Sequence, residues 1–427
     1  MFILDTVIPT HFFVPIIILL GFATIASILI KVFKLDFLPV FAIEILIGLV
    51  IANWFNGLMT DLNLTDFVHG IYTLGLSLII FLGGYEVEFD IVDDIHINVE
   101  TRAKDNNGNK ITCVKTINIL KVAVFLTVFS YIAALVVSVA LSPYISGNKL
   151  IGIILLTLVF ASTFAGLVVP ILHDLDMHDS VIGKTLATIA DLSEALSIIF
   201  LTILMIVVDV DKQYLFIFAL ILLIILGFGF FRKYNVGGFF GKFTEGVDHL
   251  ATRVVIILVF VFVLISDMAG GEYILGAFVA GIFVRRAKFS KAVMHSLERI
   301  IYGIFAPMFY IIVGTTIDVA SLISSWDSMK LVLLLIAALL IVELPVLYLL
   351  KWYNWKTVIP SLVLMSCTII VPIAVKELNH GLNIFSNQFV DALILASLLV
   401  CILGTIIFAT RFPFGEVEKD IKVKAHE

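Results

Sequence analysis

The sequence predicts an all-α polytopic membrane protein with about thirteen transmembrane helices. The chain has 427 residues, of which 61% are hydrophobic and 14% are charged, whereas soluble domains carry about 25% charged residues. Apolar stretches long enough to cross about 30 Å of hydrocarbon recur along the whole chain. The net charge is −6, and no stretch resembles a nucleic-acid-binding surface. We therefore expect membrane lipid around the chain and no nucleic-acid partner.

The basic residues fix the expected orientation of these spans. We place the spans near residues 11–33, 36–54, 66–88, 118–142, 149–173, 181–208, 213–231, 249–268, 271–286, 298–317, 329–350, 356–379 and 387–411. With the N-terminus outside, all but four of the 27 Lys and Arg residues fall in cytoplasmic loops and span ends, the four being Lys149, Lys212, Lys330 and Lys376. Because basic residues concentrate on the cytoplasmic side, we expect the N-terminus outside and the C-terminus in the cytoplasm.

Two segments are expected outside the spans. Residues 95–116 alternate on either side of Asn106–Asn109, which is a hairpin signal. We read residues 92–117 as an insertion in a cytoplasmic loop and residues 412–427 as a short cytoplasmic tail. The first residues carry no positively charged leader, so we expect no removable signal peptide.

The spans are expected to form one transmembrane domain, residues 1–411, made of two inverted repeats and a linking helix. These cover about 11–208, about 249–411 and 213–231, respectively.

The fifth span of each repeat is interrupted by small polar residues ahead of a proline. In the first repeat Ser162–Gly166 precede Pro170, and in the second Ser366–Thr368 precede Pro372. Paired interruptions at matching positions indicate a binding site near the membrane midplane in inverted-repeat transporters.

A pair of acids lies in the apolar stretch 186–208. Glu194 is near the middle of this stretch, Asp191 is one turn earlier, and Ser193 adjoins them. A carboxylate in the membrane costs about 2.5–3.5 kcal/mol on insertion scales, and two at i,i+3 lie about 5–6 Å apart. Such a pair cannot ionise freely, so one takes a proton unless a cation replaces it. The alternative is a neutral, hydrogen-bonded pair that holds a helix bundle together.

Four motifs occur in an order that resembles a known family. They are Leu38-Pro39 followed by Ile43–Gly48, Phe81–Glu88, Gly276–Gly281, and Phe309–Gly314 followed by Asp318. With them, residues from about Val14 to Thr410 resemble the second cation:proton antiporter family, which includes bacterial Na+/H+ antiporters and the membrane parts of Kef-type K+ efflux systems. The resemblance implies the Na+/H+ antiporter fold, a homodimer and a place in the bacterial plasma membrane.

The resemblance also implies an ion site. The family's site pair falls on Ser193 and Glu194, with Ser193 in place of an Asp, Asn or Gln, and Thr163 matches a Thr of the interrupted span. Glu343 stands where members often carry a buried Lys or Arg. No Lys or Arg lies near the middle of any span, so Asp191, Glu194 and Glu343 are expected to be protonated or bound to a cation.

We therefore predict a secondary active antiporter that exchanges Na+, or another monovalent cation such as K+ or Li+, for protons by alternating access. Glu194 would be the shared cation and proton site, with Asp191 and Glu343 as coupled acids. The expected further ligands are Ser193, Thr163, Ser162, Ser366 and Thr368. The alternative is a diverged member that acts as a sensor or transports another cation, organic or divalent; a proton channel is less favoured.

We expect neither an enzyme nor a bound cofactor. No paired metal ligands and no nucleophile–base arrangement are recognisable in the sequence. Its cysteines, Cys113, Cys367 and Cys401, are scattered, which predicts neither a disulfide framework nor a metal cluster.

Overall fold

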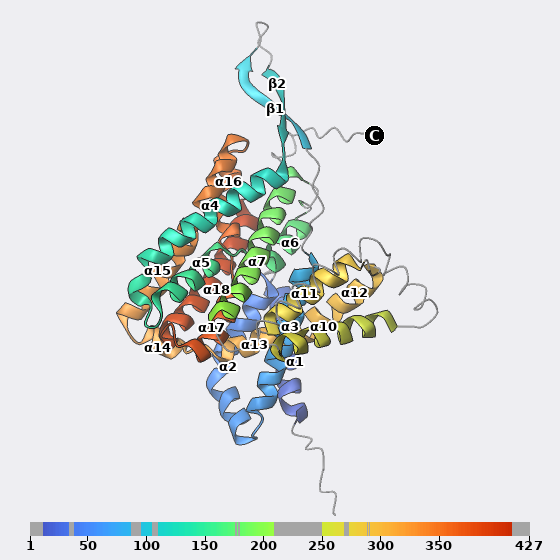
Figure 1. Ribbon diagram of the computed structural model, residues 1–427, viewed down its shortest axis with the longest axis vertical. Helices are drawn as coiled ribbons and strands as arrows, with labels where there is room; N and C mark the ends of the chain where they lie inside the picture. Colours follow the sequence, from blue (N-terminus) through green and yellow to red (C-terminus); the bar gives the residue numbers. More distant parts are fainter. Residues whose placement is uncertain are drawn as a thin grey trace, which may run out of the picture. The chain divides into compact units, whose positions relative to one another are not determined.

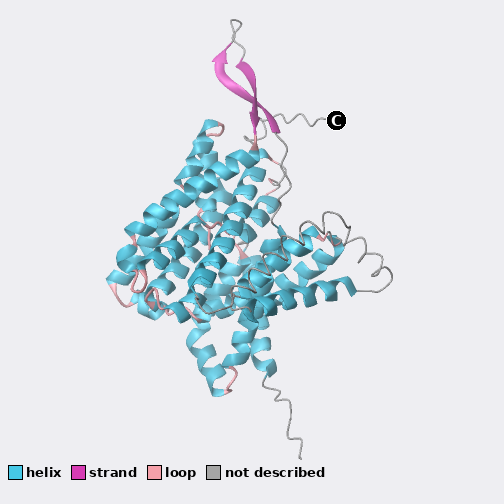
Figure 2. Ribbon diagram, in the orientation of Figure 1, coloured by secondary structure: helices cyan, strands magenta, loops and turns pink. Residues whose placement is uncertain are grey.

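The computed structural model is helical apart from one two-stranded hairpin among the residues that it describes (Figures 1 and 2). These residues are 12–33, 38–86, 95–104, 110–175, 177, 180–208, 250–268, 273–287, 289 and 291–411. Within them, ten helical segments are long and apolar enough to cross a membrane. The all-α polytopic class predicted from the sequence is therefore confirmed.

The number of spans stays a prediction. Two further expected spans are helical, as α7 (Val181–Val208) and α11 (Tyr273–Arg286). The expected linking helix, residues 213–231, lies outside the described residues, as does the tail from residue 412.

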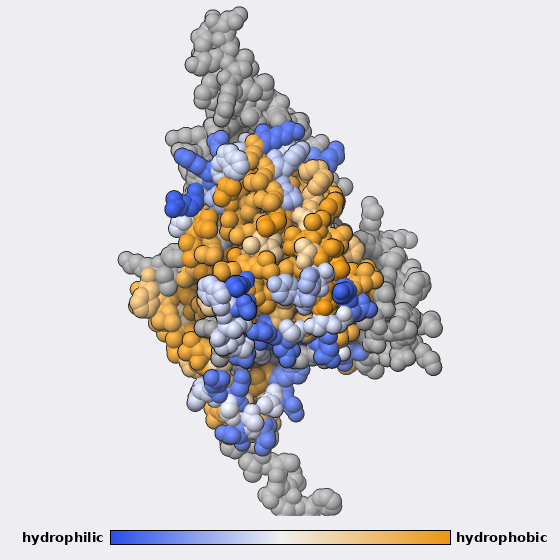
Figure 3. Space-filling view, turned by 90° about the vertical axis from the view of Figure 1, so that its left-hand side faces the viewer, coloured by the Kyte–Doolittle hydropathy of each residue, from blue (hydrophilic) through white to orange (hydrophobic). Residues whose placement is uncertain are grey.

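Large hydrophobic side chains cover much of the described surface. In Figure 3 apolar residues dominate the visible face, with hydrophilic residues gathered in separate groups. Among the exposed side chains are Ile17, Val50 and Ile132, on three different helices. Soluble proteins rarely expose this much apolar surface to water, so we infer that these side chains contact lipid.

The hairpin forms where the alternating pattern predicted it. Strands β1 (Ile95–Lys104) and β2 (Lys110–Ile117) pair antiparallel, with Ile95 opposite Ile117 and a register shift between Glu100 and Lys104. The turn at residues 106–109 is outside the described residues.

The chain divides into two compact units, and neither corresponds to one repeat. Unit 1 comprises Met1–Val87 and Ile198–Ser325, and unit 2 comprises Glu88–Ser197 and Trp326–Glu427. Each unit therefore combines spans from both predicted repeats. The described elements of unit 1 are α1 (Phe13–Phe33), α2 (Val40–Asp61), α3 (Thr65–Glu86), the end of α7, α10 (Leu250–Met268), α11, α12 (Lys291–Ile300), the π-helix η3 (Ile301–Phe305), α13 (Ala306–Thr315) and α14 (Val319–Ile323).

Two close helix crossings hold unit 1 together. α2 crosses α13 at Gly48 and Gly314, where a Cβ on either glycine would collide with the other helix's backbone. α3 crosses α11 at Gly84 and Gly281 in the same way. Small residues allow such backbone approach in membranes. All four family-like motifs therefore lie at these crossings.

The two crossings are equivalent under exchange of the repeats. The second span of the first repeat, α2, meets the third span of the second, α13. The third span of the first repeat, α3, meets the second span of the second, α11. Two-fold related repeats produce this reciprocal pairing, which supports the predicted internal repeat.

Unit 2 contains both interrupted spans. Its elements are β1, β2, α4 (Ile119–Ala140), η2 (Ser142–Tyr144), α5 (Lys149–Ala161), α6 (Ala165–Asp174), most of α7, α15 (Trp326–Val342), the 3-10 helix η4 (Leu344–Lys351), α16 (Trp355–Met365), α17 (Ile370–Leu382) and α18 (Asn387–Arg411). α4 packs on α5 and α15, and α18 packs on α15, α16 and α17 (Figure 1).

Candidate functional site

Both predicted interruptions are breaks in a helix. α5 ends at Ala161 and α6 begins at Ala165, while α16 ends at Met365 and α17 begins at Ile370. In each span a few non-helical residues separate two half-helices, because small polar residues interrupt the apolar run. A break frees helix-end carbonyls and amides inside a span, where they must find other partners.

The two breaks lie against each other. Three hydrogen bonds join them: Phe164 N donates to Cys367 O (2.7 Å), Thr163 Oγ1 donates to Met365 O (2.8 Å), and the hydroxyls of Ser162 and Thr368 are 2.6 Å apart. The four hydroxyl-bearing residues at the breaks, Ser162, Thr163, Ser366 and Thr368, are all buried. The two discontinuous helices therefore meet at their breaks.

Glu194 lies at the start of the half-helix α6. Its Oε2 accepts a hydrogen bond from Ala165 N at 2.8 Å, and its side chain is 7% exposed. Ala165 is the first residue of α6, and the N-terminus of a helix carries about half a positive charge. Anions are stabilised at such ends. The partial positive charge of the helix end thus stabilises the Glu194 carboxylate. The sequence offered no Lys or Arg near the middle of a span for this role.

Ser193 ties α7 to the same break. Its Oγ donates to Ala190 O (3.1 Å) and accepts from Thr163 N (3.2 Å). A hydroxyl has one proton and two lone pairs, so one lone pair remains for another ligand. Thr163 Oγ1 accepts no hydrogen bond from the described residues and also retains lone-pair capacity.

Three other predicted site residues also belong to unit 2. Asp191 is half-buried on α7, one turn before Glu194. Ser366 is the C-cap residue of α16, and its hydroxyl donates to Leu362 O (3.0 Å). Glu343 is 2% exposed and accepts from Ser130 Oγ of α4 at 3.2 Å.

A tyrosine that the sequence analysis did not single out supports α7. Tyr131 OH lies 2.7 Å from Ser197 Oγ and 3.3 Å from Ser193 O, and Ser197 Oγ donates to Leu158 O, near the end of α5. These contacts link α4, α7 and the last turn of α5. The only sequence signal for this chain of bonds was the polar pair Ser130-Tyr131 within an otherwise apolar span.

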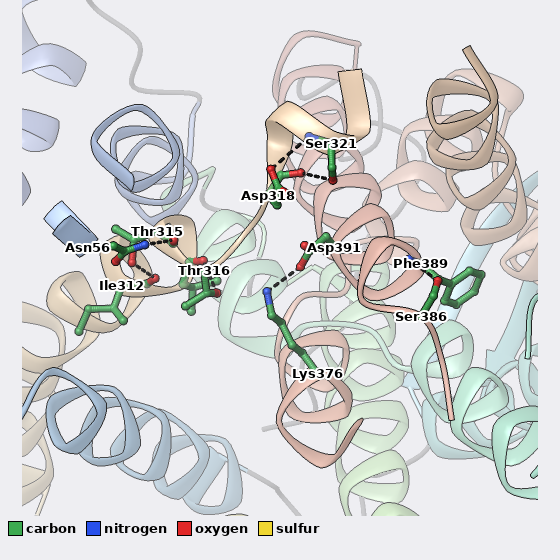
Figure 4. Close-up of polar contacts among 11 residues, drawn as sticks. Asn56, Ile312, Thr315, Thr316, Asp318, Ser321, Lys376, Ser386, Phe389 and Asp391 are labelled. Atoms are coloured by element: carbon green, nitrogen blue, oxygen red, sulfur yellow. Dashed lines mark hydrogen bonds and ion pairs between the residues drawn. The ribbon is translucent and has the colours of Figure 1, made fainter. Parts of the chain in front are cut away.

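One buried acid of unit 2 has a basic partner. Lys376 Nζ lies 2.6 Å from Asp391 Oδ1, with side chains 17% and 9% exposed, and the pair joins α17 to α18 (Figure 4). The sequence indicated Lys376 only as an outer residue of its span. Asn379, one turn further on α17, accepts from Ile384 N and Phe385 N (3.0 and 2.8 Å) and fixes the turn between these helices.

Polar contacts of unit 1 are of another kind. Asn56 of α2 donates to Thr315 O of α13 at 2.9 Å, and Asp318 accepts from Ser321 N at 3.1 Å (Figure 4). Both join backbone to short side chains near helix ends. Among the described residues, no group of three His, Cys, Asp or Glu side chains is arranged to hold a metal ion.

Comparison with known proteins places this arrangement in a family. The model of the transmembrane sodium/hydrogen exchanger family matches residues 18–412. The chain is 27% identical over 412 residues to the putative Na+/H+ antiporter YjbQ of Bacillus subtilis (strain 168), which covers 95% of this chain and 64% of that protein. It is 39% identical over 62 residues to the probable Na+/H+ antiporter GerT of Bacillus cereus, covering 14% and 16% of the two chains. The chain thus spans less than two thirds of YjbQ.

A solved structure has the same fold. The sodium proton antiporter MjNhaP1 of Methanocaldococcus jannaschii matches with a TM-score of 0.59 and 12% identity, over 95% of this chain and all of that one. This match confirms the predicted antiporter fold. The family is one of exchangers and not of enzymes, in agreement with the sequence prediction.

Proposed function

Because the chain belongs to the sodium/hydrogen exchanger family, we propose that it exchanges a monovalent cation for protons across the membrane by alternating access. The observation that carries this proposal is the Glu194 carboxylate at the start of α6, beside two crossed helix breaks. Na+ is the cation we propose first, with K+ and Li+ as the other monovalent candidates.

The proposed cation ligands are oxygen atoms of three residues. Glu194 supplies a carboxylate, and Ser193 and Thr163 each supply a hydroxyl oxygen with a remaining lone pair. Backbone carbonyls at the breaks and water complete the shell. Hard cations prefer such oxygen ligands, so this set suits Na+ better than a soft metal ion.

Exchange follows from the charge balance at Glu194. The carboxylate is neutralised either by a proton or by a monovalent cation, and each displaces the other. An empty, charged carboxylate stays confined to a state in which water reaches it, because moving it through a low-dielectric interior is costly. Only the two neutral forms then cross between the inward-open and outward-open states, which couples cation and proton movement.

Asp191 and Glu343 are proposed as coupled acids, since both lie in unit 2 with Glu194. The same three acids favour the second candidate function, a diverged member that senses or transports another cation. They offer more negative charge than one monovalent ion needs. A family Lys or Arg is replaced by Glu343, which bonds to Ser130.

Proton flux in proteoliposomes tests the proposal. Purified protein is reconstituted with an internal pH dye, and Na+, Li+, K+ or divalent cations are added outside. We expect Na+-dependent proton flux that Glu194→Gln abolishes. The matched control is Glu298→Gln on α12, whose side chain is 36% exposed. Flux that persists in Glu194→Gln would refute the assigned site, and flux without added cation would indicate a channel.

We also propose a homodimer in the bacterial plasma membrane, with its N-terminus outside. In a chain whose own cysteines are replaced by Ala, a cysteine at Asn63, in the turn between α2 and α3, should react only with outside reagent. A cysteine at Asn107, outside the described residues, should react only from the cytoplasm. Reversed labelling would overturn the thirteen-span topology, and a monomer by light scattering would refute the dimer.

A further inference from the structure

The second helix break contains a cysteine, which has no counterpart in the first break. Cys367 lies in the break and Cys401 on α18, and both side chains are 0% exposed. Cys401 Sγ donates to Thr368 O (3.7 Å), and Cys367 Sγ lies 3.6 Å from both Val363 O and Val400 O. Both thiols therefore contact carbonyl oxygens of the broken span or of α18.

The two thiols are also neighbours of each other. Each thiol contacts the backbone beside the other cysteine: Cys367 Sγ lies 3.6 Å from Val400 O, and Cys401 Sγ lies 3.7 Å from Thr368 O, although the cysteines are 34 positions apart in the sequence. Gly404, one turn beyond Cys401, packs so closely that a Cβ there would lie 2.5 Å from Cys367 Sγ. The two thiols are thus packed tightly between the second break and α18.

This sulfur pair adjoins the proposed ion site through the crossing. Cys367 O accepts from Phe164 N, the residue before α6, and the Thr368 hydroxyl meets the Ser162 hydroxyl. A cation bound to the proposed oxygen ligands of the first break would therefore lie next to the second break, which contains Cys367.

We propose that Cys367 and Cys401 form a second cation site, selective for a soft monovalent cation such as Ag+ or Cu+. Thiol and thiolate ligands prefer soft ions of this kind. The thiolate is the form that binds metal, so one thiol loses its proton as its sulfur–metal bond forms. The other thiol stays protonated and donates a sulfur lone pair.

The proposed binding step is balanced without an oxidant. One cation enters and one proton leaves, so the net charge of the buried site does not change. This neutrality matters because an added buried charge would be costly. The chemistry parallels the proposed exchange at Glu194 with sulfur in place of oxygen. Access of the ion to the crossing rests on the proposed alternating access.

Silver binding to purified protein tests the site. We use a Cys113→Ser background, so that the pair holds the only cysteines of the chain, and nitrate buffers, because chloride precipitates silver. Calorimetry should show one Ag+ per chain, and a pH indicator in weak buffer should show one proton released per Ag+. Cys367→Ser and Cys401→Ser should each reduce the stoichiometry to zero.

Two results would refute the sulfur site. No Ag+ binding in the Cys113→Ser protein, or binding that survives in either single variant, would overturn the paired site and leave the cysteines as apolar packing. Gel filtration verifies that the variants fold, and Cys367→Ala and Cys401→Ala replace any Ser variant that does not. Na+-dependent flux is measured on the same Cys113→Ser preparation. Flux without Ag+ binding refutes the sulfur site alone, and Ag+ binding without flux refutes the exchange alone.

Discussion

Each of the two helix breaks separates two half-helices within one span, but the side chains around the two breaks differ in chemistry. The first break is followed by α6, whose first amide donates to the Glu194 carboxylate. The second is followed by α17, whose Lys376 is paired with Asp391 of α18. The thiols of Cys367 and Cys401 lie at the second break in addition to its two hydroxyls.

The two interrupted spans therefore differ in the role that we propose for each. The predicted internal repeat would supply the same interrupted span twice, but under the proposed exchange only one copy needs a carboxylate that changes its charge. In the first copy the amide at a helix end bonds that carboxylate, and the proposed exchange requires that a cation or a proton can still bind to it. In the second copy a direct ion pair balances the acid and fixes the half-helix to its neighbour.

Breaking the ion pair of the second copy should have the largest effect. Lys376→Met leaves Asp391 buried without its cation, which typically costs about 3–5 kcal/mol. We expect a clearly lower thermal unfolding temperature in detergent. The double variant Lys376→Met/Asp391→Leu should recover most of it, because apolar side chains replace a buried pair well.

The control for this prediction is an exposed pair. Lys330 and Asp327 lie 3.1 Å apart with side chains 59% and 92% exposed, so Lys330→Met should change little. If Lys376→Met is as stable as Lys330→Met, the second break is not held by its ion pair. Retained Na+-dependent flux in the double variant would show that the pair positions α17 and does not carry charge.

Removing the helix-end hydrogen bond of the first copy should have the next largest effect. Ala165→Pro deletes the amide proton that Glu194 accepts, and proline is tolerated at the first helical position. The preceding Phe164 has extended backbone angles, φ −77° and ψ 96°, which suit a following proline. Loss of a hydrogen bond to a charged group costs about 1.5–3 kcal/mol, so we expect roughly 10- to 100-fold weaker Na+-dependent flux.

Ala165→Gly is the matched control because it keeps the amide proton. Its flux should stay near that of the parent protein. Equal flux in the two variants would show that the helix end does not stabilise the Glu194 carboxylate, and the comparison between the two breaks would lose its basis.

The sequence predicted the breaks and the acids because each leaves a local signal. Small polar residues before Pro170 and Pro372 interrupt apolar runs, and Glu194 stands out in a stretch of aliphatic residues. The bonding partners of these residues could not be predicted from the sequence. The amide of Ala165 carries no side-chain signal, and Lys376 meets Asp391 only because α17 turns back into α18.

Glu343 shows the same limit. Its position between α15 and η4 could be located from the sequence, but its partner Ser130 is on α4, 213 residues earlier. The thiols of Cys367 and Cys401 looked scattered for the same reason. Long-range pairing depends on which helix faces meet, and a span that is apolar all round does not reveal its faces.

The pH profile of exchange tests whether Glu343 acts with the first break. If it is coupled to Glu194, its negative charge at high pH opposes loss of the Glu194 proton. Glu343→Gln should then move half-maximal flux to lower pH, and Glu343→Lys should move it further and weaken the apparent affinity for Na+. An unchanged profile in both variants would assign Glu343 to the α4 contact alone.

The smallest expected effect concerns the hydroxyl bridge between the two copies. Ser162 Oγ donates to Val159 O (2.9 Å), so its single proton is used, and the 2.6 Å contact requires Thr368 Oγ1 to donate to Ser162. Ser162→Ala and Thr368→Val should each cost about 0.5–1.5 kcal/mol. In a double-mutant cycle the unfolding free energies should be non-additive, since both variants remove the same bond. If the losses add fully, the bridge contributes nothing measurable, and the two breaks are joined through their backbones alone.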